Sequence, residues 1–126
     1  MAEVAPQHNP GFVRLVDSVR GQIREIPAAE LPRALASTPG ARLIDVREDN
    51  EYAAGHVRGA EHLGRGVLER DIETRFPDRA TPLFLYCGGG YRSALAADSL
   101  QKMGYTHVTS IDGGWRALKH LMPTEP

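Results

Sequence analysis

The sequence predicts an α/β protein with about five parallel strands, helices on both faces of the sheet and an extra helix at the N-terminus. Short apolar stretches alternate with stretches of helical periodicity, which is typical of a parallel sheet joined by helical crossovers. The stretch from Leu83 to Tyr86 is apolar nearly throughout, as in a strand covered on both faces. With 126 residues, 41% of them hydrophobic and 25% charged, the chain has the size and composition of one soluble globular domain.

The N-terminal part is expected to contain a flexible tail and a helical extension. Residues 1–9 form the tail, and an apolar residue then recurs every three or four positions, as on one face of a helix, at Phe12, Val13, Val16 and Val19. Residues 22–26 alternate polar and apolar as in a short strand, and a second helix starts at Pro27 and tolerates Pro32 in its first turn. We therefore divide the chain into a tail (1–9), an extension (10–36) and a core (37–122), within one domain overall.

The core is predicted to alternate strands and helices. The expected strands are 43–46, 60–63, 83–86 and 107–111. The expected helices are 49–54, 67–76 and 92–103, and glycines at positions 55 and 104 end the first and the last of these. The carboxyl ends of parallel strands share one edge of a sheet, and ligands bind outside that edge. Residues that follow these strands are therefore the candidates for a site.

The only cysteine of the chain, Cys87, follows the most apolar strand and precedes three glycines. Gly88, Gly89 and Gly90 let backbone amides surround one point, and the helix that follows adds its unpaired N-terminal amides. A helix N-terminus and the nearby Arg92 both favour a thiolate. A lone cysteine is otherwise usually a small buried hydrophobe, but this electropositive setting indicates a reactive thiol.

Four stretches in this order resemble the single-domain rhodaneses, sulfurtransferases whose cysteine carries sulfur as a persulfide. Leu43 to Arg47 is similar to the family's first core strand with its Asp-Val-Arg motif, and Glu51 to Ala60 is similar to its Glu-Tyr-x-x-Gly-His-Ile-x-Gly-Ala segment. The Cys87 loop and the stretch Asp112 to Leu118, which resembles the closing Gly-Gly-aromatic-x-Ala, complete the match. The resemblance covers roughly residues 42–121, so the N-terminal helix lies outside it.

This resemblance implies a sulfurtransferase that moves sulfur from a small anionic donor such as thiosulfate to cyanide, a thiol or a protein acceptor. Cys87 is then the nucleophile, and the amides of Gly88, Gly89 and Gly90 bind the donor. Arg92 is expected to hold the anion, since arginine suits such groups. Tyr91, expected to be exposed, is a candidate acceptor contact, and Ser93 completes the substrate-binding loop. No cofactor is implied.

Three other charged residues are expected near this edge. Arg65, in a glycine-flanked loop, is either a second positive charge at the site or a surface charge. Asp45 is expected to support the site, either by pairing with Arg47 or by accepting hydrogen bonds from loop amides. His56 and Trp115 are expected to serve structure rather than chemistry.

Two alternatives use the same residues. The first is a persulfide carrier or binding module in a sulfur-trafficking pathway, which a tight protein contact at Phe12, Val16 and Val19 would favour. The second is a rhodanese-fold phosphatase or arsenate reductase. Thiolate phosphatases place arginine six positions after the cysteine, but here that position is Ser93 and arginine comes one residue earlier. The shorter loop favours a sulfur atom over a tetrahedral oxyanion.

Composition and charge exclude several classes. A net charge of −1 disfavours a nucleic-acid-binding protein driven by bulk charge. One cysteine permits neither an internal disulfide nor a metal site of paired cysteines, and we expect no metal. The N-terminus resembles no signal peptide and no stretch has the length of a membrane span, so we expect a cytoplasmic protein without a membrane partner. Oligomeric state and the physiological donor are left open.

Overall fold

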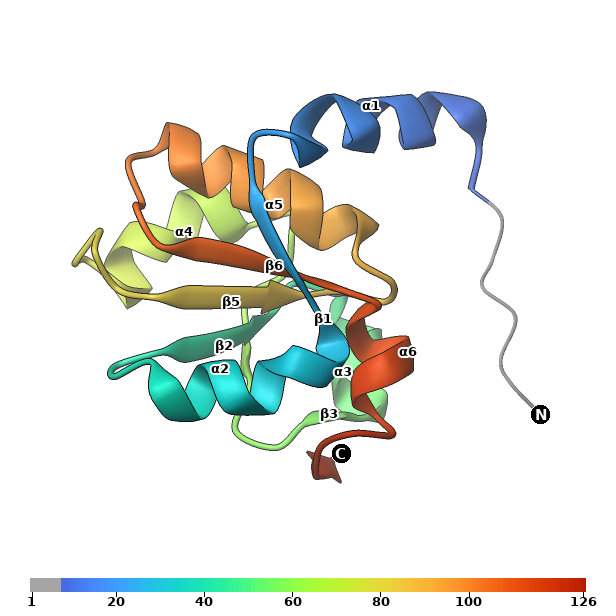
Figure 1. Ribbon diagram of the computed structural model, residues 1–126, viewed down its shortest axis with the longest axis vertical. Helices are drawn as coiled ribbons and strands as arrows, with labels where there is room; N and C mark the ends of the chain where they lie inside the picture. Colours follow the sequence, from blue (N-terminus) through green and yellow to red (C-terminus); the bar gives the residue numbers. More distant parts are fainter. Residues whose placement is uncertain (1–7) are drawn as a thin grey trace.

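The computed structural model describes residues 8–126 and contains a five-stranded parallel sheet (Figure 1). Its order is β1-β6-β5-β2-β4, with β5 in the middle and buried along its whole length. The strands are β1 (Arg24–Pro27), β2 (Arg42–Asp45), β4 (Glu61–His62), β5 (Leu83–Tyr86) and β6 (Val108–Asp112). The predicted fold class is therefore confirmed.

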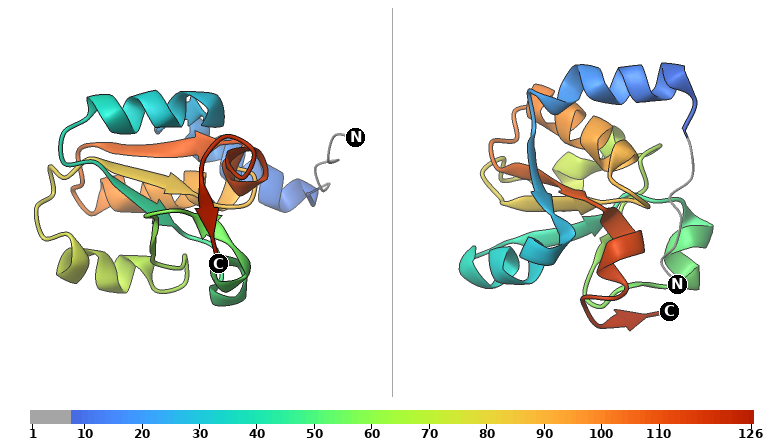
Figure 2. Two further views of the ribbon diagram at one scale, coloured as in Figure 1. Left: turned by 90° about the horizontal axis from the view of Figure 1, so that it is seen from below. Right: turned by 45° about the vertical axis from the view of Figure 1, so that its right-hand side comes forward.

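Helices cover both faces of the sheet, as predicted. Helices α4 (Leu68–Arg75) and α5 (Tyr91–Lys102) cover one face, where Ile72 and Leu100 are fully buried. The 3-10 turn η1 (Ala28–Glu30) with helices α2 (Leu31–Ser37) and α6 (Gly114–Leu118) covers the other, around Leu31 and Leu118. Figure 2 shows the sheet between α2 on one side and α4 on the other. The short helix α3 (Asp49–Ala54) lies at the carboxyl end of the sheet (Figure 1).

The predicted N-terminal helix is present as α1 (Pro10–Arg20), and it packs on the outer side of α5 (Figure 1). Val16 is fully buried, and Phe12, Val13 and Val19 are partly buried on the same helix. The apolar stripe of α1 is thus covered by its own chain. Residues 1–7 of the predicted tail lie outside the described residues, whereas Asn9 is the N-cap of α1.

A second, two-stranded sheet was not predicted. In it, β3 (His56–Val57) pairs antiparallel with β7 (Thr124–Glu125). Two-residue strands have no periodicity that a sequence pattern can reveal, and their pairing joins segments 69 residues apart. Helix α6 was missed for a related reason, since five residues are too short for a helical pattern. The helix predicted to start at Pro27 is divided into η1 and α2.

The carboxyl ends of β5 and β6 bring two glycine-rich turns together. Cys87 follows β5, and Gly113 and Gly114 follow β6. Helices α5 and α6 begin from these turns at the same end of the sheet (Figure 1). Within residues 8–126, no helix is long and apolar enough to cross a membrane.

Candidate active site

The loop after β5 folds around the sulfur atom of Cys87. The amides of Gly90 and Ser93 donate hydrogen bonds to Sγ, at 3.2 and 3.3 Å. Cys87 is only 1% exposed, whereas Gly88 and Gly89 are partly exposed. Amide donors stabilise negative charge on the atom they face. Such a loop can stabilise a negatively charged sulfur, and Gly88 and Gly89 form its outer side.

The start of α6 binds the carbonyl groups of the same loop. Trp115 N donates to Cys87 O at 2.7 Å, and Arg116 N donates to Gly88 O at 3.0 Å. Gly113 N adds a bond to the carbonyl of Gly89, at 3.2 Å. The amides of this loop are different: no protein group within residues 8–126 accepts a hydrogen bond from the amides of Gly88 and Gly89. These two amides are available to a ligand.

Two of the glycines in these turns are required by close backbone approach. Gly90 has φ +107°, and a Cβ there would lie 3.3 Å from Ile111 O. Gly114 has φ +48°, and a Cβ there would lie 2.9 Å from the carbonyl carbon of Gly88. Side chains rarely adopt positive φ, and a Cβ would be tight against backbone at Gly90 and would collide with it at Gly114. Gly90 lets the end of β6 approach the cysteine loop, and Gly114 lets α6 contact it directly.

A pair of buried hydroxyl groups lies beneath the cysteine. Ser93 Oγ is 3.5 Å from Sγ and 2.8 Å from Ser110 Oγ, and both serines are fully buried. Ser93 thus contacts Cys87 through its amide and its hydroxyl, and its role in substrate binding stays a prediction. Ser110, on β6, was not predicted, because only the pairing of β5 with β6 brings it there.

Arg92 forms a bidentate ion pair with Glu51, with N–O distances of 2.7 and 3.1 Å. These hydrogen bonds raise the pKa of Arg92, and the nearby Cys87 sulfur adds to this rise. The same bonds hold the pKa of Glu51 below its ordinary value. Arg92 is therefore close to the cysteine as expected, but much of its charge is balanced by a residue that sequence reasoning did not select. The only sequence signal for Glu51 was its place in the second family-like stretch, Glu51 to Ala60.

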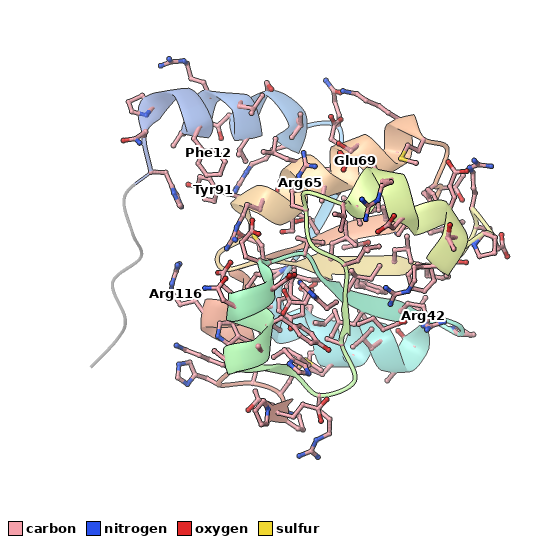
Figure 3. All side chains as sticks on the ribbon, turned by 180° about the vertical axis from the view of Figure 1, so that it is seen from behind. Phe12, Arg42, Arg65, Glu69, Tyr91 and Arg116 are labelled. Carbon is pink, nitrogen blue, oxygen red and sulfur yellow. The ribbon has the colours of Figure 1, made fainter. Side chains whose placement is uncertain are left out.

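Arg116 is a second arginine at the loop, and it was also missed. Its Nη1 lies 3.0 Å from the point where a Cβ on Gly89 would be, so the guanidinium rests against the loop backbone. Within residues 8–126 no carboxylate forms an ion pair with it. Figure 3 shows Arg116 at the edge of the molecule that also carries Phe12 and Tyr91.

The environment of Tyr91 differs from the prediction. Tyr91 is the first residue of α5, and its ring lies 5.6 Å from that of Phe12 and 4.2 Å from that of His8. The guanidinium of Arg20 stacks over it at 4.9 Å. The prediction that Tyr91 is exposed is wrong, because α1 covers its side chain from one side and leaves it partly buried.

Arg65 pairs with Glu69 at 2.8 Å, across one turn at the start of α4 (Figure 3). No hydrogen bond or ion pair joins Arg65 to the cysteine loop within the described part of the chain. The pairing with Glu69 is what the surface-charge alternative requires. A role for Arg65 in the site stays a prediction.

Asp45 and Arg47 form a buried ion pair at 2.7 Å, one of the two arrangements considered for them. Arg47 also donates to the carbonyl of Gly55 at 2.7 Å, and its guanidinium lies 4.7 Å from the centre of the Trp115 ring. Because the amide of Trp115 binds Cys87 O, the pair supports the residue that holds the loop. The pair of Asp45 and Arg47 thus contacts Trp115, and Trp115 in turn contacts the cysteine loop.

His56 lies in a structural setting. It is 5% exposed, its Nδ1 lies 3.0 Å from Tyr52 O, and its Nε2 lies 3.3 Å from a carboxylate oxygen of Glu125. These contacts tie α3 to the C-terminal strand, and no hydrogen bond joins the ring to Cys87 within the described residues. Residues 8–126 contain no group of three or more His, Cys, Asp or Glu side chains that could hold a metal ion.

Comparison with known proteins places this chain in a family. A family model of the rhodanese-like domain matches residues 27–121. The thiosulfate sulfurtransferase GlpE of Tolumonas auensis is 36% identical over 90 residues, which are 71% of this chain and 83% of that protein. The uncharacterized protein YqhL of Bacillus subtilis is 38% identical over 76 residues, 60% of this chain, and the match spans 59% of YqhL.

The solved structures include a protein of unknown function from Rhodopseudomonas palustris, described as a possible tyrosine phosphatase. It superposes with a TM-score of 0.77 and 29% identity, over 97% of this chain and all of that chain. The match therefore extends N-terminal to the part covered by the family model, which begins at residue 27. From the family model and the sequence relatives we conclude that this chain belongs to the rhodanese-like domain family.

Proposed function

We propose that the protein is a thiosulfate-type sulfurtransferase that works through a persulfide on Cys87. The observation that carries the proposal is the amide environment of Sγ, with two donors on the sulfur and the free amides of Gly88 and Gly89 beside it. The membership in the rhodanese-like family and the likeness to a thiosulfate sulfurtransferase support it. The arrangement suits a sulfur anion that gains and loses one sulfur atom.

In the first half-reaction the Cys87 thiolate attacks the outer sulfur of thiosulfate. An Sγ–S bond forms, the S–S bond of thiosulfate breaks, and sulfite leaves with the electron pair of that bond. The amides of Gly90 and Ser93 stabilise the attacking thiolate. The amides of Gly88 and Gly89 are assigned to the transferred sulfur, and Arg92 contributes positive charge near Cys87.

In the second half-reaction a nucleophilic acceptor removes the outer sulfur. With cyanide, a C–S bond forms, the Sγ–S bond breaks and its electron pair returns to Cys87 as the thiolate. Thiocyanate is released, and charge is conserved in both steps. The scheme requires neither a cofactor nor a general base, and a cytoplasmic, reducing environment would keep the single thiol available.

The carrier alternative loses one of its arguments. The apolar face of α1, considered as a partner contact, packs on α5 of the same chain, with Val16 fully buried. The phosphatase alternative is suggested by the name of the Rhodopseudomonas palustris protein. We do not adopt it, because Arg92 comes one residue earlier than in thiolate phosphatases and is engaged by Glu51.

The test is intact-protein mass spectrometry of the reduced protein after incubation with thiosulfate. We expect a gain of one sulfur atom that cyanide removes with release of an equal amount of thiocyanate. Cys87→Ser should take up no sulfur while keeping the fold, since the hydroxyl has nearly the size of the thiol. Absence of sulfur uptake by the reduced wild-type protein, or uptake that persists in Cys87→Ser, would overturn the proposal. Hydrolysis of p-nitrophenyl phosphate by the same samples would point to the phosphatase instead.

A further inference from the structure

Two guanidinium groups border the outer side of the cysteine loop. Arg92 Nη2 lies 3.1 Å from the point where a Cβ on Gly88 would be, and Arg116 Nη1 lies 3.0 Å from the same point on Gly89. These two glycines also carry the amides that have no protein acceptor. An anion placed over them would meet an arginine on each side. The glycines are needed for this, since a methyl group on either would crowd a guanidinium.

The two arginines differ in how much charge they offer. Arg92 donates from two nitrogens to the two carboxylate oxygens of Glu51, so the negative charge of Glu51 balances much of the positive charge of Arg92. No carboxylate within residues 8–126 forms an ion pair with Arg116. Arg116 is only partly exposed, and its backbone amide is fixed to Gly88 O at 3.0 Å, which holds the residue beside the loop. Figure 3 shows its side chain at this edge of the molecule.

The charge around the sulfur favours a second cation for an anionic donor. The thiolate is accompanied by Glu51 and by the exposed carboxylate of Asp112, whose Cα packs against Gly90. With Arg92 as the only cation, these three negative charges would repel an incoming dianion. A guanidinium brings five donors and a permanent charge, which suits sulfonate and carboxylate groups.

We propose that Arg116 is the specificity-determining residue that captures the negatively charged end of the sulfur donor while the amides of Gly88 and Gly89 hold the sulfur to be transferred. The proposal rests on the proposed function for the identity of the donor. It assigns the protein to donors that carry an oxyanion group next to the sulfane sulfur. In the family-like motif Gly-Gly-aromatic-x-Ala, Arg116 occupies the unspecified position, so the family resemblance by itself assigns it no role.

The first measurement is the kcat/KM for thiosulfate of Arg116→Gln. We expect a loss of about 10- to 100-fold, carried mainly by KM, which corresponds to the loss of one charged hydrogen-bonding group. Arg116→Lys keeps the charge and should recover part of the loss. The matched control is Arg24→Gln, which removes an exposed arginine at the amino end of β1, away from the site. Its kcat/KM should stay within about twofold of wild type.

The second measurement needs no sulfur transfer. Cys87, the only thiol, is alkylated with iodoacetate and with iodoacetamide, which share a mechanism and differ by one negative charge. Arg116→Gln should lower the ratio of the iodoacetate rate constant to the iodoacetamide rate constant several-fold. The loss should shrink in high salt, because salt screens the attraction between Arg116 and the carboxylate of iodoacetate. Arg24→Gln should leave the ratio unchanged.

The two measurements separate the two proposals. If wild type gains no sulfur from thiosulfate, the proposed function fails, and the alkylation ratio still tests Arg116. If wild type is active but Arg116→Gln keeps both its kcat/KM for thiosulfate and its alkylation ratio within twofold, the role of Arg116 is overturned. Equal losses with Arg24→Gln would also overturn it, since they would show an effect of net charge alone.

Discussion

The substitution Gly114→Ala tests the contact between α6 and the cysteine loop. Gly114 has φ +48°, and a Cβ there would lie 2.9 Å from both the carbonyl carbon and the oxygen of Gly88. Those atoms belong to backbone that α6 itself holds, through the bonds from Trp115 N to Cys87 O and from Arg116 N to Gly88 O. One methyl group should therefore separate the two turns and disturb the loop around the sulfur.

The cost follows from two terms. A left-handed conformation costs an alanine about 1–2 kcal/mol relative to glycine. Forcing a methyl group into packed backbone costs about 1–3 kcal/mol more. We expect a loss of about 2–5 kcal/mol in the free energy of unfolding, a large part of the roughly 5–15 kcal/mol that stabilises a domain.

Urea unfolding measures the loss, and sulfur uptake from thiosulfate by the folded fraction measures the disturbance of the loop. The control is Gly11→Ala in α1, where a Cβ meets nothing within 4 Å and alanine suits the helix. That variant should be as stable as wild type or about 0.5–1 kcal/mol more stable. A Gly114→Ala protein within about 0.5 kcal/mol of wild type and with normal sulfur uptake would refute the reasoning, because α6 would then not constrain the loop.

Three further substitutions test other contacts. Asp45→Asn leaves Arg47 charged in a buried site, and we expect unfolding to become easier by about 3–5 kcal/mol in urea titrations. Val16→Ala should destabilise the packing of α1 on α5 by about 1–3 kcal/mol, seen as a lower urea midpoint. Glu51, whose pKa Arg92 holds below its ordinary value of 4.5, contributes stability above that pH that is lost as pH falls through the lower folded-state value. Glu51→Gln should therefore show a flatter fall in stability than wild type when thermal unfolding is followed from pH 6 to pH 3.

The first two of these have a control in the same chain. Asp71→Asn breaks an exposed ion pair with Arg70 and should leave the urea midpoint nearly unchanged. Leu15→Ala truncates a side chain that is 54% exposed and should change stability by less than about 0.5 kcal/mol. The burial argument would be contradicted if Asp45→Asn lost no more stability than Asp71→Asn. It would also be contradicted if Val16→Ala lost no more stability than Leu15→Ala. A Glu51→Gln protein with the pH dependence of wild type would mean that the pair with Arg92 does not contribute to folding.

The sequence alone determined the fold class and the glycine-rich turn that follows the only cysteine. The apolar run Leu83 to Tyr86 predicted the buried central strand, and the glycines after Cys87 predicted a turn with amides around the sulfur. These features are encoded locally, because strand periodicity, glycine conformation and the start of a helix depend on neighbouring residues. The order of the family-like stretches then predicted the family, and the matching family model confirmed it.

Only the tertiary structure decided how the loop is held and charged. Glu51 reaches Arg92 across 41 residues, and the start of α6 binds the carbonyls of the cysteine loop. Arg116 and the cover over Tyr91 likewise come from segments distant in sequence. No local pattern records such contacts, because the pairing of β5 with β6 and the packing of α1 on α5 create them. The sequence thus located the thiol, and the packing of distant segments determined which arginine beside it has a carboxylate partner.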